Sequence, residues 1–303
     1  MNQLRQFAIV LVYFSLAILP TVSRADDPLD AFPTAENTAE DRVKKLSEVE
    51  LQAITLPADG NQIVLSITYL PLADSQQPDA LPTEPLLRVF ADGRIDCGSL
   101  LLAHKERAKD SLSKSELQWL LHLATNECQI LTRSTKAISD NYKSRRRRPA
   151  DPGEPAREIR YHLALLSGKN ELVIPEMALV LRPLRAEMKL PAFASFHHYA
   201  NFLVARAFMG TEKERETILK AVNEKMKSTH DTLPPFRIDH LGAALRGLPN
   251  VELSVVFQQE IPLGRAKYKR VTATFIQRDQ GAEPEIKLNV LEYTRYAEAR
   301  GNK

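Results

Sequence analysis

The chain has 303 residues, two cysteines, and 41 Lys and Arg against 38 Asp and Glu. Two of the basic residues, Arg5 and Arg24, and none of the acidic ones lie in the first 25 positions, so the rest of the chain has 39 basic against 38 acidic residues, a net charge of +1. This balance excludes the basic composition that is typical of nucleic-acid-binding domains, and no nucleic-acid partner is expected.

The first 25 residues have the pattern of a secretory signal peptide. Arg5 gives a weakly basic start, Phe7–Leu19 is an almost unbroken apolar run, and Pro20 ends it. Ser23 and Ala25 supply the small residues that precede a cleavage point. An uncleaved anchor is the alternative, although the run is shorter than the ~20 residues of a membrane-spanning helix. We therefore expect an exported protein, periplasmic or extracellular, with no transmembrane span after cleavage.

The clearest structural pattern predicts a β-hairpin. Leu86–Ala91 is rich in residues that suit a half-buried strand. Asp92 and Gly93 follow at once, and this dipeptide is a strong signal for a two-residue turn, because glycine tolerates the positive φ that such turns need. Arg94–Cys97 then alternates polar and apolar residues, as the second strand of a hairpin does.

A helix is expected to follow this hairpin and to pack on it. Ser113 and Glu116 have the spacing of a capping box, in which each residue satisfies a backbone N–H of the other. Apolar residues then recur at helical spacing for about four turns. They are Leu117, Leu120, Leu121, Ala124 and Cys128.

The two segments read LRVFADGRI over Leu87–Ile95 and LSKSELQWLL over Leu112–Leu121. Here the chain resembles a domain of uncharacterised exported bacterial proteins, in which a strand with Asp-Gly-Arg precedes a helix that opens Leu-Ser-x-x-Glu-Leu. The resemblance covers about Leu86–Cys128. Its motifs are structural, and it implies no activity and no functional residue.

The two cysteines, Cys97 and Cys128, are both expected to face the core between hairpin and helix. An exported chain can hold a disulfide. Such a bridge would close a loop of about 30 residues and stabilise the fold by roughly 3 kcal/mol. The alternative is two buried free thiols, because free cysteine is itself a residue that cores often contain.

The remaining elements complete an α+β fold of antiparallel sheets with helices packed mainly on one face. They are a strand at Gln62–Leu70, a hairpin of Glu158–Leu166 and Asn170–Ile174, helices at Ser195–Met209 and from Thr211, a short helix at Ile238–Leu248, and strands at Val251–Ile261, Lys269–Gln277 and Glu285–Tyr293. The order hairpin, loop, helix occurs twice, which suggests a repeated unit as a hypothesis.

Composition divides the chain into a hairpin-helix unit at 26–141, with a disordered acidic start, and a second α+β unit at 157–303 that ends in a three-stranded meander. Between them, 142–156 is basic and rich in proline, which predicts a solvated loop. Its arginines Arg145, Arg146, Arg147 and Arg148 form a candidate contact loop for an envelope protein or a polysaccharide.

One pair of motifs imitates a serine acyl-transfer site. Ser111 and Lys114 have S-x-x-K spacing, and Ser139–Asn141 reads S-D-N. The motifs are only 28 residues apart, too few for the helical domain that normally separates them, and no Lys-Thr-Gly or Lys-Ser-Gly follows. We therefore reject this assignment.

The histidines offer weak candidates for catalysis. His197 and His198 are adjacent on a predicted helix and point about 100° apart, so they do not chelate one metal well, and Phe202 stands where a second ligand to His198 should be. His198 and Asn201 could line the cleft of a hydrolase, whereas a surface or capping role is the plainer interpretation. No metal or cofactor is predicted, since no ligand motif or phosphate-binding loop is present.

These patterns favour an exported, non-catalytic envelope protein that acts as a binding or scaffolding module. The motifs that stand out predict turns, helix caps and core positions. The alternative is a periplasmic or secreted hydrolase whose site assembles only in three dimensions, and catalysis therefore stays open.

Overall fold

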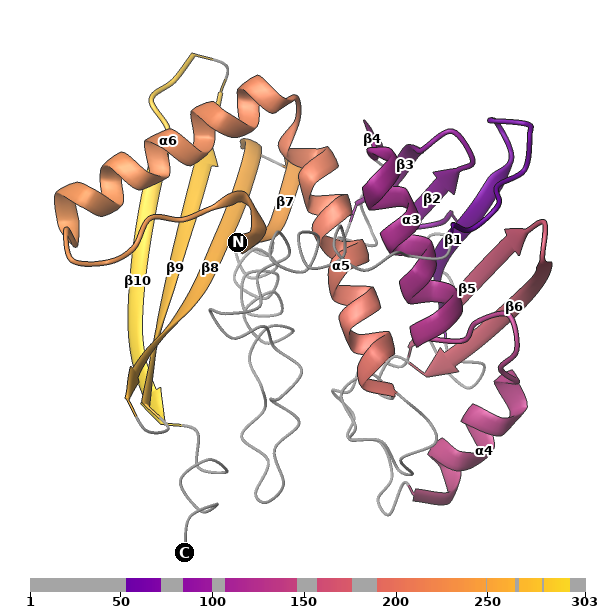
Figure 1. Cartoon of the computed structure of the whole chain (residues 1–303). Helices are drawn as coiled ribbons and strands as arrows, with labels where there is room; N and C mark the ends of the chain where they lie inside the picture. Colours follow the sequence, from indigo (N-terminus) through magenta and orange to yellow (C-terminus); the bar gives the residue numbers. More distant parts are fainter. Residues whose placement is uncertain are drawn as a thin grey trace, which may run out of the picture.

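The computed structural model describes residues 53–71, 84–99, 107–145, 157–175, 190–248, 250–264, 267–279 and 281–294. Two antiparallel sheets and the helices between and over them form an α+β fold, which confirms the predicted class (Figure 1). The expected signal peptide, the acidic N-terminal segment and the side chains of the four arginines at 145–148 lie outside the described residues. In the described parts, no helix is long and apolar enough to cross a membrane.

The first sheet has six strands in the order β4-β3-β2-β1-β5-β6. Their bounds are β1 Ile63–Pro71, β2 Leu87–Phe90, β3 Arg94–Gly98, β4 Arg107–Ser111, β5 Arg157–Leu165 and β6 Gly168–Pro175. β1 pairs with both β2 and β5, so this sheet takes strands from both sides of the segment 142–156. β4 was not predicted from the sequence.

The predicted β2–β3 hairpin is present, with a longer turn than expected. Three residues, Ala91 to Gly93, separate the strands, and Gly93 has φ +89°. A Cβ atom at Gly93 would lie 2.9 Å from the carbonyl oxygen of Leu112, so both the conformation and the close approach require glycine.

Helix α3 (Lys114–His122) begins at the predicted capping box: Ser113 Oγ accepts from the N–H of Glu116 at 3.2 Å, and a Glu116 carboxylate oxygen accepts from the N–H of Ser113 at 2.8 Å. The expected four-turn α-helix is shorter, because the chain continues as a π-helical turn, η3 (Leu123–Glu127). Helix α4 (Thr135–Arg145) then runs along β6.

The second sheet has four strands in the order β10-β9-β8-β7. After the 3₁₀ turn η6 (Ile238–His240), the strands are β7 Leu241–Leu248, β8 Val251–Gly264, β9 Lys267–Gln277 and β10 Glu285–Thr294. The three predicted strands are confirmed, and the predicted helix over Ile238–Leu248 is wrong. Leu241, Ala243, Ala244 and Leu245 are all buried, because β7 is covered on both faces, and such a run cannot be distinguished from a helix by its period.

Helix α5 (Leu190–Met209) lies between the two sheets and packs on β7, β4 and β3 (Figure 1). It is buried on most of its sides, as expected for an interior helix. Its buried apolar residues are Phe193, Phe196, Tyr199, Ala200, Leu203, Val204, Ala205, Ala207, Phe208 and Met209. Helix α6 (Glu212–Thr229) crosses the four-stranded sheet. One continuous core therefore joins both sheets through α5.

The structure decides between the two alternatives for the cysteines. Cys97 on β3 and Cys128 after η3 are completely buried and free, so the possible disulfide is absent and the alternative of two buried free thiols is confirmed. Both pack as small apolar side chains in the core under α3. Burial raises the pKa of each thiol far above its ordinary value, so both stay protonated and unreactive.

Candidate functional site

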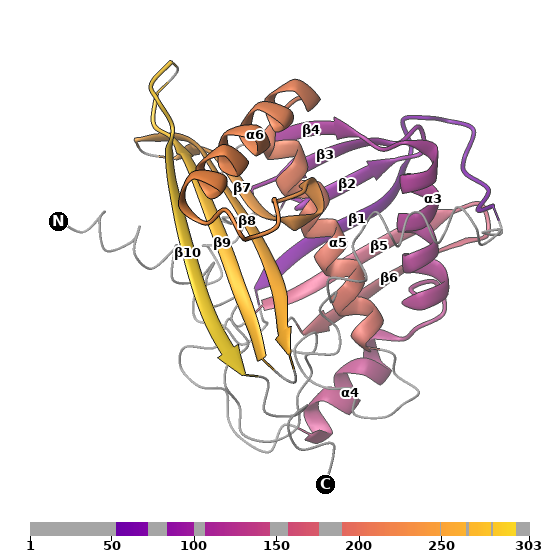
Figure 2. The ribbon, with the colours of Figure 1, turned by 60° about the vertical axis from the view of Figure 1, so that its left-hand side comes forward.

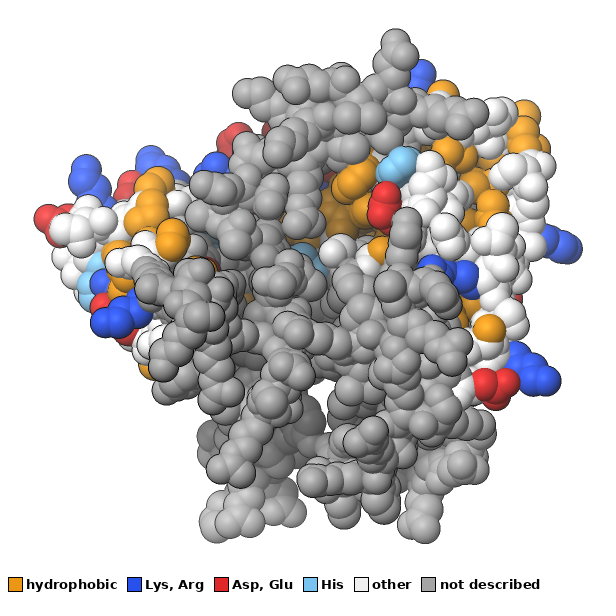
Figure 3. Space-filling model, turned by 60° about the horizontal axis from the view of Figure 1, so that its bottom comes forward, with side chains coloured by type: hydrophobic (Ala, Val, Ile, Leu, Met, Phe, Trp, Pro, Cys, Tyr) orange, Lys and Arg blue, Asp and Glu red, His pale blue; other side chains and the backbone are white. Residues whose placement is uncertain are grey.

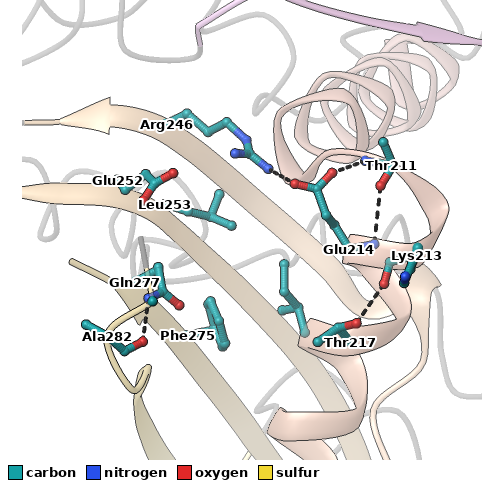
Figure 4. Close-up of a pocket in the computed structure, with 12 residues that line it drawn as sticks. Thr211, Lys213, Glu214, Thr217, Arg246, Glu252, Leu253, Phe275, Gln277 and Ala282 are labelled. Carbon is teal, nitrogen blue, oxygen red and sulfur yellow. Dashed lines mark hydrogen bonds and ion pairs between the residues drawn. The ribbon is translucent and has the colours of Figure 1, made fainter. Parts of the chain in front are cut away.

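A pocket with a volume of about 430 Å³ lies between the first turns of α6 and the four-stranded sheet (Figure 4). Its floor is apolar: Ile218 comes from α6, Leu253 from β8 and Phe275 from β9. All three side chains are buried. The floor is therefore the edge of the hydrophobic core where it borders the pocket. Two paired strands and the helix above them contribute its side chains.

One side of the rim is an ion pair that the backbone holds in place. Glu214 accepts a hydrogen bond from the N–H of Thr211 at 2.6 Å and from Arg246 Nη2 at 3.1 Å. Arg246 also donates to the carbonyl oxygens of Phe208 at 2.6 Å and Met209 at 3.0 Å, the last carbonyls of α5. The hydrogen bonds from Thr211, together with the Arg246 guanidinium, lower the pKa of Glu214 below its ordinary value. The pair is therefore charged and fixed.

The opposite side of the rim is the turn between β9 and β10. The Gln277 amide nitrogen donates to the carbonyl oxygens of Asp279 at 2.7 Å and Ala282 at 2.6 Å. Gly281 in the same turn has φ +88°, which favours glycine. These bonds hold the turn as a wall of the pocket and leave the Gln277 Oε1 atom free of hydrogen bonds within the described ranges.

The rim also holds Lys213, which is exposed on the first turn of α6 (Figure 4). Its ammonium has no ion-pair partner in the part of the chain that the structure describes. The pocket thus combines a buried apolar floor, the fixed ion pair, the carboxylate of Glu252, and, among the described residues, a cation without an ion-pair partner and an amide oxygen without a hydrogen bond. It can hold a ligand with an apolar group that enters the floor and an acidic group that meets Lys213.

A second polar cluster is buried in the core between α5 and the six-stranded sheet. His197 of α5 is 8% exposed. The hydroxyl of Tyr69 on β1 lies 2.9 Å from His197 Nε2, and the hydroxyl of Tyr161 on β5 lies 3.5 Å from Nδ1. A neutral imidazole donates through one nitrogen and accepts through the other, so these contacts satisfy a buried polar side chain and hold α5 against the sheet.

An ion-pair network lies where β4, α3, α5 and α6 meet. Arg206 donates to Asp110 at 2.9 Å, to Glu116 and to the carbonyl oxygen of Ser111 at 3.2 Å, and Arg215 donates to Asp110 at 3.0 Å. These charged side chains are mostly buried. The network ties the two helices to the edge of the six-stranded sheet.

The predicted site residues are not part of the pocket. The side chain of His198 is exposed on α5, while that of its neighbour His197 is buried. Asn201, one turn further along, is half-buried, and its Oδ1 atom is buried with no hydrogen-bond partner among the described residues. A catalytic role for His198 and Asn201 stays a prediction.

The pocket was not predicted from the sequence, although the sequence does show the capping box that forms one side of its rim. Thr211 and Glu214 have the same capping-box spacing as Ser113 and Glu116, and the structure forms both boxes. Arg246 could not be joined to Glu214, because its segment was predicted as a helix. The distance between them depends on how α5 packs on β7.

Two further observations concern charges and metal ligands among the described residues. On the face seen in Figure 3, basic and acidic side chains of the described residues are interspersed, without a patch of one sign. No group of three His, Cys, Asp or Glu residues that could hold a metal ion occurs within the described ranges. No family model, no curated protein and no solved structure matches this chain.

Proposed function

We propose that the protein is an exported binding module of the cell envelope and that its ligand is held in the pocket between α6 and the four-stranded sheet. The observation that carries this proposal is the union of a buried apolar floor with a fixed polar rim. Ligand sites typically have this composition, and a volume of about 430 Å³ lies within their usual range.

The proposed ligand is a short peptide segment of an envelope protein, with an apolar side chain next to an acidic one. The floor is mainly aliphatic, since Ile218 and Leu253 flank Phe275, and this suits an inserted side chain better than a sugar ring, which prefers an open aromatic face. The ammonium of Lys213, which has no ion-pair partner among the described residues, then favours a carboxylate. The ion pair between Glu214 and Arg246 needs no rearrangement on binding, which lowers the cost of ordering the site.

The experiment measures calorimetric binding to the mature chain, which starts at Asp26. Two pools of acetylated tetrapeptides serve as probes, one pairing apolar with acidic residues and the other pairing apolar with basic residues. We expect the acidic pool to bind, and the variant Lys213→Glu to weaken it about ten-fold. Lys220→Glu makes the same charge change two turns along α6, at an exposed position, and should leave binding unchanged.

Three outcomes would contradict the proposal. Neither pool binds, the basic pool binds better than the acidic one, or Lys213→Glu and Lys220→Glu weaken binding equally. Fragments of the host's envelope polysaccharide are titrated in parallel, and binding of these fragments alone would replace the peptide with a polysaccharide as the ligand class.

A further inference from the structure

Strand β10 is the outermost strand of the four-stranded sheet (Figure 2). It pairs with β9 along its whole length, from Glu285 opposite Ile276 to Thr294 opposite Lys267. In the described parts of the chain, no strand pairs with its other edge. A strand of ten residues therefore presents backbone N–H and C=O groups that can accept another strand.

The other three sheet edges are covered by helices. At β4, Asp110 is held by Arg206 of α5 and Arg215 of α6. At β6, Thr135 of α4 accepts a hydrogen bond from the backbone N–H of Val173 at 3.0 Å. At β7, α5 packs along the strand. Helices of the chain therefore cover three of the four sheet edges, and the β10 edge is the one that no helix of the described residues covers.

The side chains of β10 add an apolar surface to this edge. Ile286, Leu288 and Val290 lie on the face that α6 covers, and they pack against the core but are only partly buried. On the opposite face, Leu291 is 50% exposed. Another strand beside β10 would remove part of this apolar surface from water.

We propose that β10 pairs antiparallel with β10 of a second copy of this chain, about a two-fold axis through Leu288, and so joins two four-stranded sheets into one of eight strands. A two-fold axis perpendicular to a sheet keeps the same face on the same side, so each residue must oppose one of the same face. Centred on Leu288, the pairing sets Ile286 against Val290 of the partner subunit and Leu288 against its own counterpart. One face of the junction is then a continuous apolar row.

The neighbouring registers are worse. Pairing centred on Lys287 opposes the two Lys287 side chains directly, and like charges directly opposite are destabilising. Pairing centred on Asn289 sets Glu292 against Ile286, and pairing centred on Val290 sets Glu292 against Leu288. Each interrupts the apolar row with a charged side chain, twice per dimer. On the face that α6 covers, Ile286, Leu288 and Val290 form an apolar row that is symmetric about Leu288, which is why the proposed occupant is a second copy rather than an unrelated strand.

The opposite face of the junction accepts the same register. Lys287 lies opposite Asn289 of the partner subunit, and Glu285 lies opposite its Leu291, so no like charges are directly opposed. Each Lys287 is already paired with Glu285 of its own strand at 3.0 Å. A charge placed at Asn289, which is exposed, would directly face Lys287 of the partner subunit.

Sedimentation of the mature chain over a range of concentrations tests this proposal. We expect a reversible dimer. Asn289→Lys opposes two like charges at the junction and should weaken the dimer about ten-fold, whereas Asn289→Glu opposes unlike charges and should keep or tighten it. In the monomer, position 289 lies opposite the neutral Thr272, so neither variant creates an ion pair with β9. Leu166→Lys, at a 64% exposed position in the β5–β6 turn, is the matched control and should not change the dimer.

Cross-linking tests the register independently. Leu288→Cys places two thiols at the axis and should give a covalent dimer under mild oxidation, because the native Cys97 and Cys128 are buried and do not compete. Glu292→Cys places the two thiols four residues from the axis on either side, and should not cross-link. A chain that stays monomeric at every concentration, equal effects of Asn289→Lys and Asn289→Glu, or cross-linking of Glu292→Cys in preference to Leu288→Cys would overturn the proposal.

Discussion

The two sheets of this protein differ in how their edges are covered, although each holds a mostly buried ion pair: Arg206 with Asp110 at the six-stranded sheet, and Arg270 with Glu260 on the four-stranded sheet. Around the six-stranded sheet, charged side chains such as Arg206 and Asp110 are buried against each other, and helices cover both edges. The four-stranded sheet also has a more exposed ion pair, Glu214 with Arg246, at the rim of a pocket, and it leaves β10 at an edge with no strand partner in the described residues. Both proposed contact surfaces therefore lie on the four-stranded sheet, and the six-stranded sheet has its edges packed against helices.

The largest expected effect is the loss of the buried network. Arg206→Met removes the guanidinium that neutralises the mostly buried carboxylates of Asp110 and Glu116. It should lower the free energy of unfolding by about 3 kcal/mol. Arg246→Met removes a more exposed guanidinium and should cost about 1–2 kcal/mol. Urea unfolding of both variants measures the two losses. Equal losses would contradict the contrast between the sheets.

The parts of the fold that the sequence predicts are those in which local chemistry and tertiary packing agree. The β2–β3 hairpin and strands β8 to β10 each turn one face toward the core, so a period of two shows in their residues, and the Ser113 cap depends only on residues three positions apart. Strand β4 has no such period: its five residues include two basic ones and one acidic one, and it is held by pairing with β3 and by the contacts of Asp110. Only the tertiary structure provides these partners.

The candidate site was less predictable than the fold, because its parts are far apart in the chain. The pocket needs Lys213 from α6, Arg246 from β7 and Gln277 from β9 together. In the same way, the sequence drew attention to His198, but it is His197 that the core encloses between Tyr69 and Tyr161. Which of two adjacent histidines faces inward depends on how α5 is rotated between the sheets.

The next largest effect on the free energy of unfolding is expected from removing the Tyr69 hydroxyl, which contacts the buried His197. Tyr69→Phe removes one hydrogen-bond partner of a buried imidazole and should cost about 1–2 kcal/mol in unfolding free energy. Tyr293→Phe on β10 removes a hydroxyl bonded to Glu260 at a less buried place, and should cost less than about 1 kcal/mol. Thermal unfolding measures both variants. A larger loss for Tyr293→Phe would reverse the comparison.

The two capping boxes allow the same change to be made at a helix next to each sheet, because each box has the same pair of hydrogen bonds. Ser113→Ala at α3 and Thr211→Ala at α6 each remove the side-chain acceptor for one backbone N–H, and each should cost about 1 kcal/mol. Thr211→Ala should also loosen the pocket rim, because Glu214 is the partner of Thr211 in its box. Amide hydrogen exchange of the first turn of each helix measures this local opening. Exchange that stays slow in both variants would show that the caps contribute little.

The smallest expected effect is the pH dependence that Glu116 and Glu214 share. Burial raises the pKa of Glu116, but the Arg206 guanidinium and the hydrogen bonds with Ser113 outweigh it, so that the pKa lies below its ordinary value of 4.5. The pKa of Glu214 is lowered as well, through its bonds with Thr211. A carboxyl whose pKa is lower in the folded state binds protons less readily there than in the unfolded chain. Its stabilisation is therefore complete above about pH 4.5 and is lost as the pH falls through the folded-state value.

Urea midpoints of the wild type, Glu116→Gln and Glu214→Gln, measured from about pH 6 down to about pH 3, test this dependence. Each variant should be less stable than the wild type at the upper end, and the difference should shrink as the pH falls, because protonation removes the same charge from the wild type. The shrinkage should be greater for Glu116→Gln, since its partner Arg206 is mostly buried, whereas Glu214 is half exposed and its attraction to Arg246 is weakened by solvent. A difference that stays constant with pH would show that the glutamate in question stabilises its helix without its charge. For Glu116, that result would contradict the expected acid sensitivity of the buried ion-pair network.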